Sequence, residues 1–189
     1  VTDAGGAVAG VIVEPNRQGD DCPGRAGAGG GVSFSGLVAL RRRMRGAGGV
    51  ADDKGPDLTA LLGLGAVGTV ADLVVLDANN RALVSAGLRR LRAGHACVGL
   101  KALIEASGRD AARLTATDIG FALGPRLHAA GRLEDMALGI ALLLTEDPRQ
   151  ARDIAQTLEQ INAERRAAQQ SMLDDAQQAA PSLTTFLTR

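Results

Sequence analysis

The segment over residues 148–180 constrains the fold more than any other part of the sequence. It contains no glycine and no internal proline, and Ile154, Leu158 and Ile161 recur at helical spacing among charged residues. Glycine and proline are the residues that interrupt helices most strongly, and a narrow apolar stripe among charges is typical of a surface helix. We therefore predict one long, largely exposed helix that serves as a connector or an interface element and ends at Pro181.

Four shorter stretches with apolar residues at helical spacing are also predicted to be helices. They cover residues 32–45, 81–92, 99–107 and 136–144. Asp57 suits the N-cap position before a further helical stretch. Short apolar runs at residues 11–13 and 70–76 are predicted to be strands, the second of them buried.

Composition and charge indicate the cellular compartment of the protein but not its function. The formal net charge is zero, and no apolar run approaches the roughly 20 residues that cross a bilayer. Cys22 and Cys97 are far apart and form no CxxC pair, which suits a reducing compartment and argues against a structural zinc. We therefore predict a cytoplasmic protein. The first residues, VTDAGG, lack an initiating Met and a signal-peptide pattern, so we expect the sequence to begin inside a longer protein.

The basic residues are almost all arginine, since Lys54 and Lys101 are the only lysines. The planar guanidinium binds phosphate through two hydrogen bonds at once, so this bias fits a protein that handles phosphate. A coding bias toward arginine, alanine and glycine explains the same composition, and the 25 glycines fit it. Composition alone leaves both explanations open.

Gly63, Gly65 and Gly68 form a GxGxxG pattern. A dinucleotide-binding fingerprint needs a strand before the glycines, a helix after them and an acidic residue about 20 positions later. Here a helical pattern precedes the glycines, a strand-like run follows them, and no acidic residue lies near position 88. Because the order of elements is reversed, the pattern does not predict a nicotinamide cofactor.

Asp72 stands in the middle of the apolar run GTVADLVVLDANNR. A buried carboxylate without a partner costs several kcal/mol or becomes protonated. A cationic group should therefore lie nearby, which could be an arginine, a helix N-terminus or a metal ion. Asp72 could also simply cap a helix or close a turn, and the residues alone leave both roles open.

The segment LGPRLHAAGRLEDM sets Arg126, His128 and Arg132 among small residues. Glycine and proline interrupt it, so we predict a loop. Small residues let the backbone approach a ligand closely, and long cations in such a loop would suit an anion. Pairing of the two arginines with neighbouring carboxylates is the alternative, and it remains open.

Together, GTVADLVVLDANNR, IGFALGPRLHAAGRLEDM and the long Gln/Glu/Arg-rich helix resemble the single-strand-specific 5′→3′ DNA exonucleases of the DHH phosphoesterase superfamily. VTD followed by VEPNRQ, and RAGHACVGLKALIEASGRD, support a resemblance over nearly the whole chain. It implies an α/β fold, the C-terminal half of a DHH-type domain with a parallel sheet flanked by helices, over residues 1–147. The connector helix over 148–180 and the start of a following domain at 181–189 would complete the chain.

The resemblance also implies metal-dependent phosphodiester hydrolysis in DNA repair and recombination. Asp72 matches an aspartate that binds the catalytic Mn²⁺ or Mg²⁺, and Arg132 matches an arginine at the scissile phosphate, so both are implied to be catalytic. Arg126 and His128 are implied to bind substrate phosphate beside Arg132, although the family usually has Asn in place of His128. The implied partners are single-stranded DNA, a single-strand-binding protein and a recombination helicase.

The chain departs from the family at Asp3, Ala4 and Gly5, where the family carries Asp-His-His. Ala4 replaces a metal-binding histidine and Gly5 a phosphate contact, and neither has a ligand atom in its side chain. The resemblance implies that Asp3 lies near the metal ligands without binding the metal itself. The family's other acidic motifs would precede this sequence, and its Gly-Gly-His and nucleic-acid-binding domains would follow it. One metal carboxylate cannot hold two ions about 4 Å apart, so we expect the isolated chain to be inactive.

Two other functions remain open. A degenerate, non-catalytic member of the superfamily with a structural or DNA-holding role would also lack the two histidines. The other is a DHH phosphoesterase that acts on small nucleotides, such as short oligonucleotides or cyclic dinucleotides. The long helix and the GPRLHAAGR segment resemble the exonucleases more than they resemble such enzymes.

Overall fold

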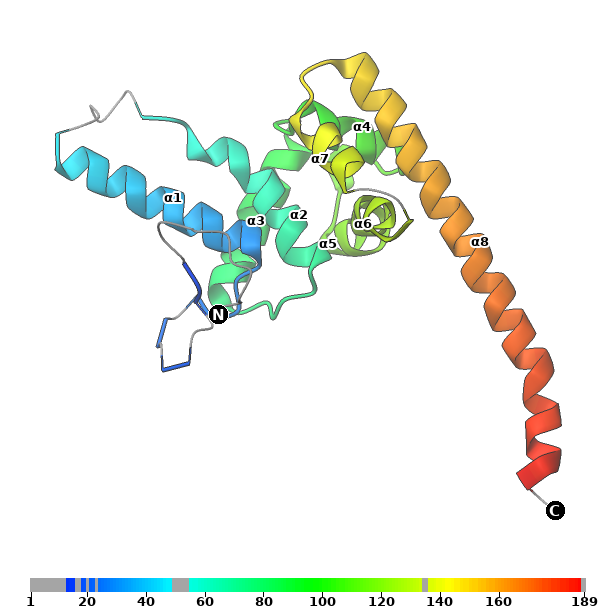
Figure 1. Cartoon of the computed structure of the whole chain (residues 1–189). Coiled ribbons are helices and arrows are strands. Elements are labelled where there is room, and N and C mark those ends of the chain that lie inside the picture. Colours follow the sequence, from blue (N-terminus) through cyan, green and yellow to red (C-terminus); the bar gives the residue numbers. More distant parts are fainter. Residues whose placement is uncertain are drawn as a thin grey trace.

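The computed structural model describes residues 13–15, 18–19, 21–22, 24–48, 55–133 and 136–187, with the backbone alone at 130–133 and 179–187. All regular structure in these residues is helical (Figure 1). In chain order the elements are α1 (Gly29–Gly46), η1 (Leu58–Leu61), α2 (Leu62–Ala71), α3 (Ala78–Arg92), α4 (Val98–Ala106), η2 (Ala111–Arg113), α5 (Ala116–Asp118), η3 (Ile119–Leu123), α6 (Gly124–Leu133), α7 (Ala137–Leu144) and α8 (Pro148–Leu187).

The predicted α/β fold with a parallel sheet is wrong for this chain, because the described residues contain no strand. Of the run at 70–76, the first residues end α2 and the others form a loop in which Val75 is 72% exposed. The Val75 carbonyl accepts a hydrogen bond from Asn80 Nδ2 at 2.7 Å instead of from a neighbouring strand. Of the strand predicted at 11–13, only Val13 is described, and it is not in a strand. A short apolar run suits a buried helix as well as a buried strand, and here helix packing decided between them.

The helices predicted from apolar spacing are present as α1, α3, α4 and α7, and Asp57 caps η1 by accepting a hydrogen bond from the Thr59 N–H at 2.9 Å. The loop predicted at 123–136 is wrong, because residues 124–133 form α6. Pro125 lies in the first turn of α6, where a missing N–H breaks no hydrogen bond. The long helix is confirmed as α8, but it continues past Pro181 to Leu187.

One hydrophobic cluster joins α2, α3, α4, η3, α7 and the first half of α8. Eight of its side chains have no exposed surface: Leu103, Leu114, Ile119, Leu123, Leu142, Ala151, Ala155 and Leu158. Each buried leucine or isoleucine contributes about 1.5–3 kcal/mol relative to an exposed one. The cluster therefore fixes the first half of α8 against the other helices, whereas the second half extends away from them (Figure 1).

Glycines bring α2 and α3 into direct contact. A Cβ atom at Gly87 would lie 2.3 Å from the Leu62 carbonyl oxygen and 2.4 Å from Ala66 Cβ. Gly63, from the GxGxxG pattern, lies inside α2, where an added Cβ would lie 3.0 Å from Leu91 Cδ2. Gly87 is therefore required by the close packing of the helix pair, whereas a Cβ atom at Gly63 would need only the end of the Leu91 side chain to shift.

The turn before η3 is closed by a reciprocal cap. The Thr115 hydroxyl and N–H donate to Asp118 Oδ2 at 2.7 and 2.9 Å, and the Asp118 N–H donates back to Thr115 Oγ1. These bonds hold the pKa of Asp118 below its usual value. The stabilisation is therefore present above the unfolded pKa and is lost as the pH falls through the lower, folded pKa.

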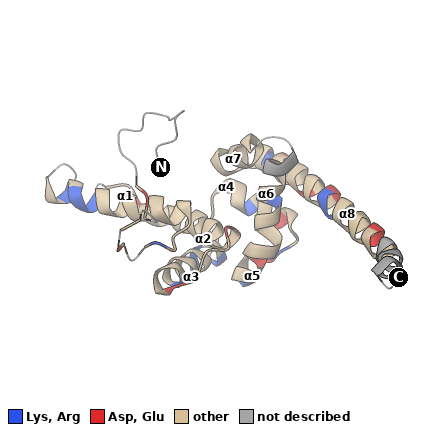
Figure 2. Cartoon of the chain, turned by 60° about the horizontal axis from the view of Figure 1, so that its bottom comes forward, with Lys and Arg blue, Asp and Glu red and all other residues tan. Residues whose placement is uncertain are grey.

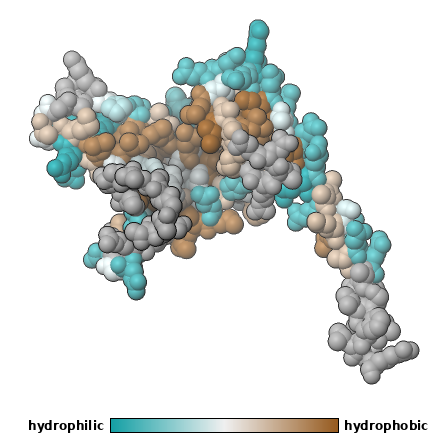
Figure 3. Space-filling view, in the orientation of Figure 1, coloured by the Kyte–Doolittle hydropathy of each residue, from teal (hydrophilic) through white to brown (hydrophobic). Residues whose placement is uncertain are grey.

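Helix α1 leaves part of its apolar surface uncovered. Leu37, Val38, Leu40 and Met44 are 39–52% exposed, and hydrophobic residues line the surface along this helix (Figure 3). They do not make a membrane span, since no helix in the described part of the chain has the necessary length and apolarity.

We expect Gly87→Ala to lower the free energy of unfolding by about 1–3 kcal/mol or more, because the added methyl group overlaps the backbone of α2. The matched control is Gly36→Ala in the middle of α1, where an added Cβ has no neighbour within 4 Å. That change should instead stabilise the helix, by up to about 1 kcal/mol. Urea unfolding of the two variants measures the difference, and equal effects would refute the packing argument.

Candidate functional site

The C-terminal end of α2 presents Asp72 to solvent. Asp72 is the C-cap residue, its N–H donates to the Gly68 carbonyl at 3.0 Å, and its side chain is 51% exposed. The burial predicted for Asp72 is therefore wrong. The apolar residues before it are in α2 and those after it are in the loop, so they do not enclose the carboxylate.

Leu73 turns the chain sharply away from α2. It has a φ of 55° and is the only residue other than glycine with a positive φ in the described part of the chain. Such a backbone costs about 1–3 kcal/mol, and residues of this kind gather at functional sites. The side chain is 86% exposed, so packing of Leu73 does not explain the strain. The turn does hold Asp72 at the very end of the helix.

The position of Asp72 favours a cation. A helix has a partial negative charge at its C-terminus, so a carboxylate there is unfavourable by about 0.3–1 kcal/mol unless a positive charge compensates it. Within the described residues its one ion-pair partner is His128, with Nε2 3.8 Å from Asp72 Oδ1, and this partner is charged only when protonated.

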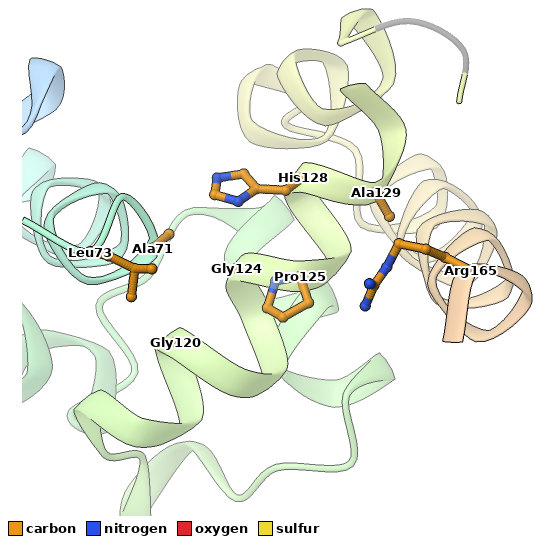
Figure 4. Close-up of a pocket in the computed structure, with 8 residues that line it drawn as sticks. All are labelled: Ala71, Leu73, Gly120, Gly124, Pro125, His128, Ala129 and Arg165. Atoms are coloured by element: carbon orange, nitrogen blue, oxygen red, sulfur yellow. The ribbon is translucent and has the colours of Figure 1, made fainter. Parts of the chain in front are cut away.

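His128 reaches Asp72 because α6 lies directly against the end of α2. A Cβ atom at Gly124 would lie 3.2 Å from Ala71 Cβ, so a larger residue would push the two helices apart. The π-helical turn η3 leads into α6, and π-helical turns occur frequently at functional sites. His128 points from α6 toward the residues that end α2 (Figure 4).

Arg126 has a different environment from His128, although both are on α6. Its side chain is 9% exposed, its Nε donates to Glu159 of α8, and its Nη1 donates to the Ala122 carbonyl at 2.6 Å. Protein groups therefore already satisfy this guanidinium. Phosphate binding by Arg126 remains a prediction, and it would require phosphate to replace Glu159.

The other predicted site residues have no described side chains. Arg132 lies within the bounds of α6, but only its backbone is described. Asp3 and Ala4 lie outside the described residues. The structure thus brings Asp72 and His128 together and leaves the roles of the other residues as predictions.

Arg165 of α8 is a site residue that the sequence analysis missed. It lines a pocket of about 210 Å³ together with His128, Leu73 and small residues of η3 and α6 (Figure 4). The available signal was its spacing, since Leu158 and Asn162 are buried on α8 and Arg165 continues the same helical face.

The described residues offer part of a metal site. A carboxylate oxygen such as that of Asp72 is a suitable ligand for Mn²⁺ or Mg²⁺, and the end of α2 favours a cation there. However, the described residues contain no group of three or more His, Cys, Asp or Glu side chains that could hold an ion. Asp72 therefore fits a divalent cation as one ligand of a larger set, with His128 beside it.

Comparison with known proteins shows which class of protein this chain resembles. No protein-family model matches it, but proteins named single-stranded-DNA-specific exonucleases are 37–50% identical to it over 87–88% of its length. The chain spans only about 29% of the length of the first of these relatives. The resemblance inferred from the sequence motifs is thereby confirmed.

The matched exonucleases are RecJ proteins. RecJ of Dickeya dadantii is 50% identical over 169 residues, and RecJ of Escherichia coli is 47% identical over 169 residues. A crystal structure of RecJ from Thermus thermophilus in complex with Mg²⁺ matches with a TM-score of 0.64 and 36% identity, over 77% of this chain and 21% of that one. Its Mn²⁺ complex gives the same TM-score. The chain is similar in sequence and fold to one segment of RecJ.

We expect Glu159→Gln to lower the free energy of unfolding by about 1–3 kcal/mol, because the buried Arg126 guanidinium loses its carboxylate partner. Glu164→Gln is the matched control on α8, since Glu164 is exposed and, among the described residues, bonds only to Gln160 of the same helix at 3.1 Å. This control should change the free energy by less than about 0.5 kcal/mol. If urea unfolding gives the same value for both variants, the Arg126 pair does not fasten α6 to α8.

Proposed function

We propose that this chain is part of a metal-dependent 5′→3′ exonuclease that acts on single-stranded DNA in repair and recombination. The observation that carries the proposal is 50% identity, over 88% of the chain, with a single-stranded-DNA-specific exonuclease. The convergence of Asp72 and His128 at the end of α2 supports it independently.

In this proposal Asp72 binds a divalent cation, Mn²⁺ or Mg²⁺, the ions present in the Thermus thermophilus RecJ structures. The bound cation supplies Lewis-acid chemistry toward the phosphoryl oxygens. His128, which lies beside Asp72, donates a hydrogen bond from its ring to a phosphate oxygen. Arg132 stabilises the negative charge that grows on the phosphoryl group during hydrolysis.

The proposal extends to location and partners. We place the protein in the cytoplasm, with single-stranded DNA as its substrate. A single-strand-binding protein and a recombination helicase are the protein partners that the family resemblance implies.

A non-catalytic, DNA-holding relative is the second candidate. Ala4 and Gly5 favour it, because they stand where the family carries two histidines. The complete gene product separates the candidates: an enzyme degrades single-stranded DNA when Mn²⁺ is added, and a holding protein binds it without degrading it. A phosphoesterase for small nucleotides would instead cleave dinucleotides in preference to long strands.

In the complete gene product, we expect Asp72→Ala to reduce Mn²⁺-dependent nucleotide release by at least about 100-fold, a loss typical of removing a group that acts electrostatically in the transition state. Without divalent cations the same variant should be more stable by about 0.3–1 kcal/mol, since an unfavourable carboxylate leaves the end of α2.

Asp77→Ala is the matched control in the same loop. Asp77 caps α3 by accepting a hydrogen bond from the Asn80 N–H at 2.8 Å. Its loss should cost about 1 kcal/mol of stability and leave nucleotide release nearly unchanged. If both variants lose stability and retain activity, Asp72 is a structural cap and not a cation ligand.

We also expect the isolated 189-residue chain to release no nucleotides from single-stranded DNA in Mn²⁺. The described residues lack a complete ligand set for one ion, and a two-metal centre needs ligands for two. The complete gene product, assayed in parallel on 5′-labelled and 3′-labelled strands, is the positive control. Metal-dependent release by the purified chain, resistant to further purification, would contradict this expectation.

A further inference from the structure

We infer that Arg165, on the connector helix α8, binds a backbone phosphate of the DNA strand and so makes α8 part of the substrate-binding surface. This inference rests on the proposed function and adds a residue to the same site. It begins from the pocket between the end of α2, η3, α6 and α8, which Arg165 enters from α8 (Figure 4).

The fold directs Arg165 toward this pocket. Leu158 and Asn162 on the same face of α8 are 0% and 1% exposed. Arg165 Nη2 donates to the buried Asn162 side-chain oxygen at 3.3 Å, and Nη1 donates to Gln169 Oε1 at 3.2 Å. The guanidinium is therefore held on the inner face of the helix, where α8 leaves the core.

The charge of Arg165 is not neutralised by these partners. Both acceptors are side-chain amides, and no ion pair of Arg165 is found in the described part of the chain. Arg126, which is buried against the same helix, is paired with Glu159 instead. A partly buried arginine with neutral partners remains available to an anion, and its planar fork suits phosphate.

The pocket walls are compatible with a phosphodiester strand. They are formed largely by Ala71, Gly120, Gly124, Pro125 and Ala129, and none of the described residues that line it is acidic. Small side chains let a strand approach the helix backbone closely. Beyond the pocket, acidic and basic residues both occur along the exposed part of α8 (Figure 2), so charge along that helix is mixed and Arg165 is distinguished by its place in the pocket.

The position of the pocket relates Arg165 to the cleavage site. His128, at its other side, is also the residue that contacts Asp72. A strand whose cleaved phosphate lies at Asp72 and His128 can thus place a neighbouring phosphate at Arg165. The hydrogen bonds that Arg165 makes to described residues stay within α8, so its removal should leave the contacts between helices intact.

The test measures binding of the complete gene product to a fluorescent single-stranded oligonucleotide, with divalent cations removed by EDTA to prevent cleavage. At fixed salt we expect Arg165→Ala to weaken binding about tenfold. Because one phosphate contact on a single strand contributes about 0.7 to the slope of log K against log salt, that slope should become shallower by about this amount. Arg165→Lys should retain the slope, since it keeps the charge.

Arg166→Ala is the matched control, because it removes an exposed arginine from the adjacent position of α8, outside the pocket lining. It should change the binding affinity and the slope of log K against log salt much less than Arg165→Ala does. Thermal unfolding should show all three variants folded at the assay temperature, and in Mn²⁺ Arg165→Ala should raise KM with little change in kcat. A slope unchanged by Arg165→Ala, or equal effects of the two alanine variants, would overturn the inference.

Failure of the inference is distinguishable from failure of the proposed function. If the unaltered protein binds and degrades single-stranded DNA while Arg165→Ala behaves like it, only the role of Arg165 is refuted. If the unaltered protein neither binds nor degrades single-stranded DNA, the proposed function is refuted, and the inference with it.

Discussion

The rest of the structure depends on the backbone contact between α2 and α3 at Gly87. The space for a side chain there is filled by the Leu62 carbonyl and the Ala66 methyl group, so the two helices lie closer together than ordinary side chains permit. Small residues along α2 make this contact possible, and Val67 joins α2 to the main hydrophobic cluster. The position of α2 is thereby fixed from several sides, and the position of its C-terminal end, where Asp72 lies, follows from it.

The candidate site combines a rigid support with an unfavourable local arrangement. Gly124 against Ala71 fixes α6 beside the end of α2, while Leu73 has a strained backbone and Asp72 places a negative charge at the negative end of a helix. Neither feature stabilises the chain by itself. A cation bound there would account for the strained backbone and the negative charge, because its binding free energy would offset their cost. Strain and charge therefore point to the same position that the family resemblance indicates.

The sequence predicted the helices better than it predicted the fold class. Helices such as α3 and α8 carry regular apolar spacing over several turns, and that spacing survives in the structure. The strand predicted at 70–76 failed because small apolar residues carry no period that separates a buried strand from a buried helix. At the site, the burial predicted for Asp72 was wrong, since the carboxylate is half exposed, and its role as a metal ligand stays a prediction. Arg165 was missed because its significance depends on packing between α8 and α6, which local sequence does not encode.

Helix α8 packs against the core and, in the proposed function, also contacts the DNA strand. A connector that only joined two domains would need a packing face, which Leu158 provides, and solvent-exposed charges, which the residues after Arg166 provide. It would not need a buried Asn162 whose side chain holds an arginine over a pocket, because burying an amide is costly unless its hydrogen bonds are made. Glu159 and Asn162 are one turn apart, and the first neutralises an arginine of α6 while the second leaves the charge of Arg165 available. The same helix face therefore separates an arginine that stabilises the fold from one that can bind an anion.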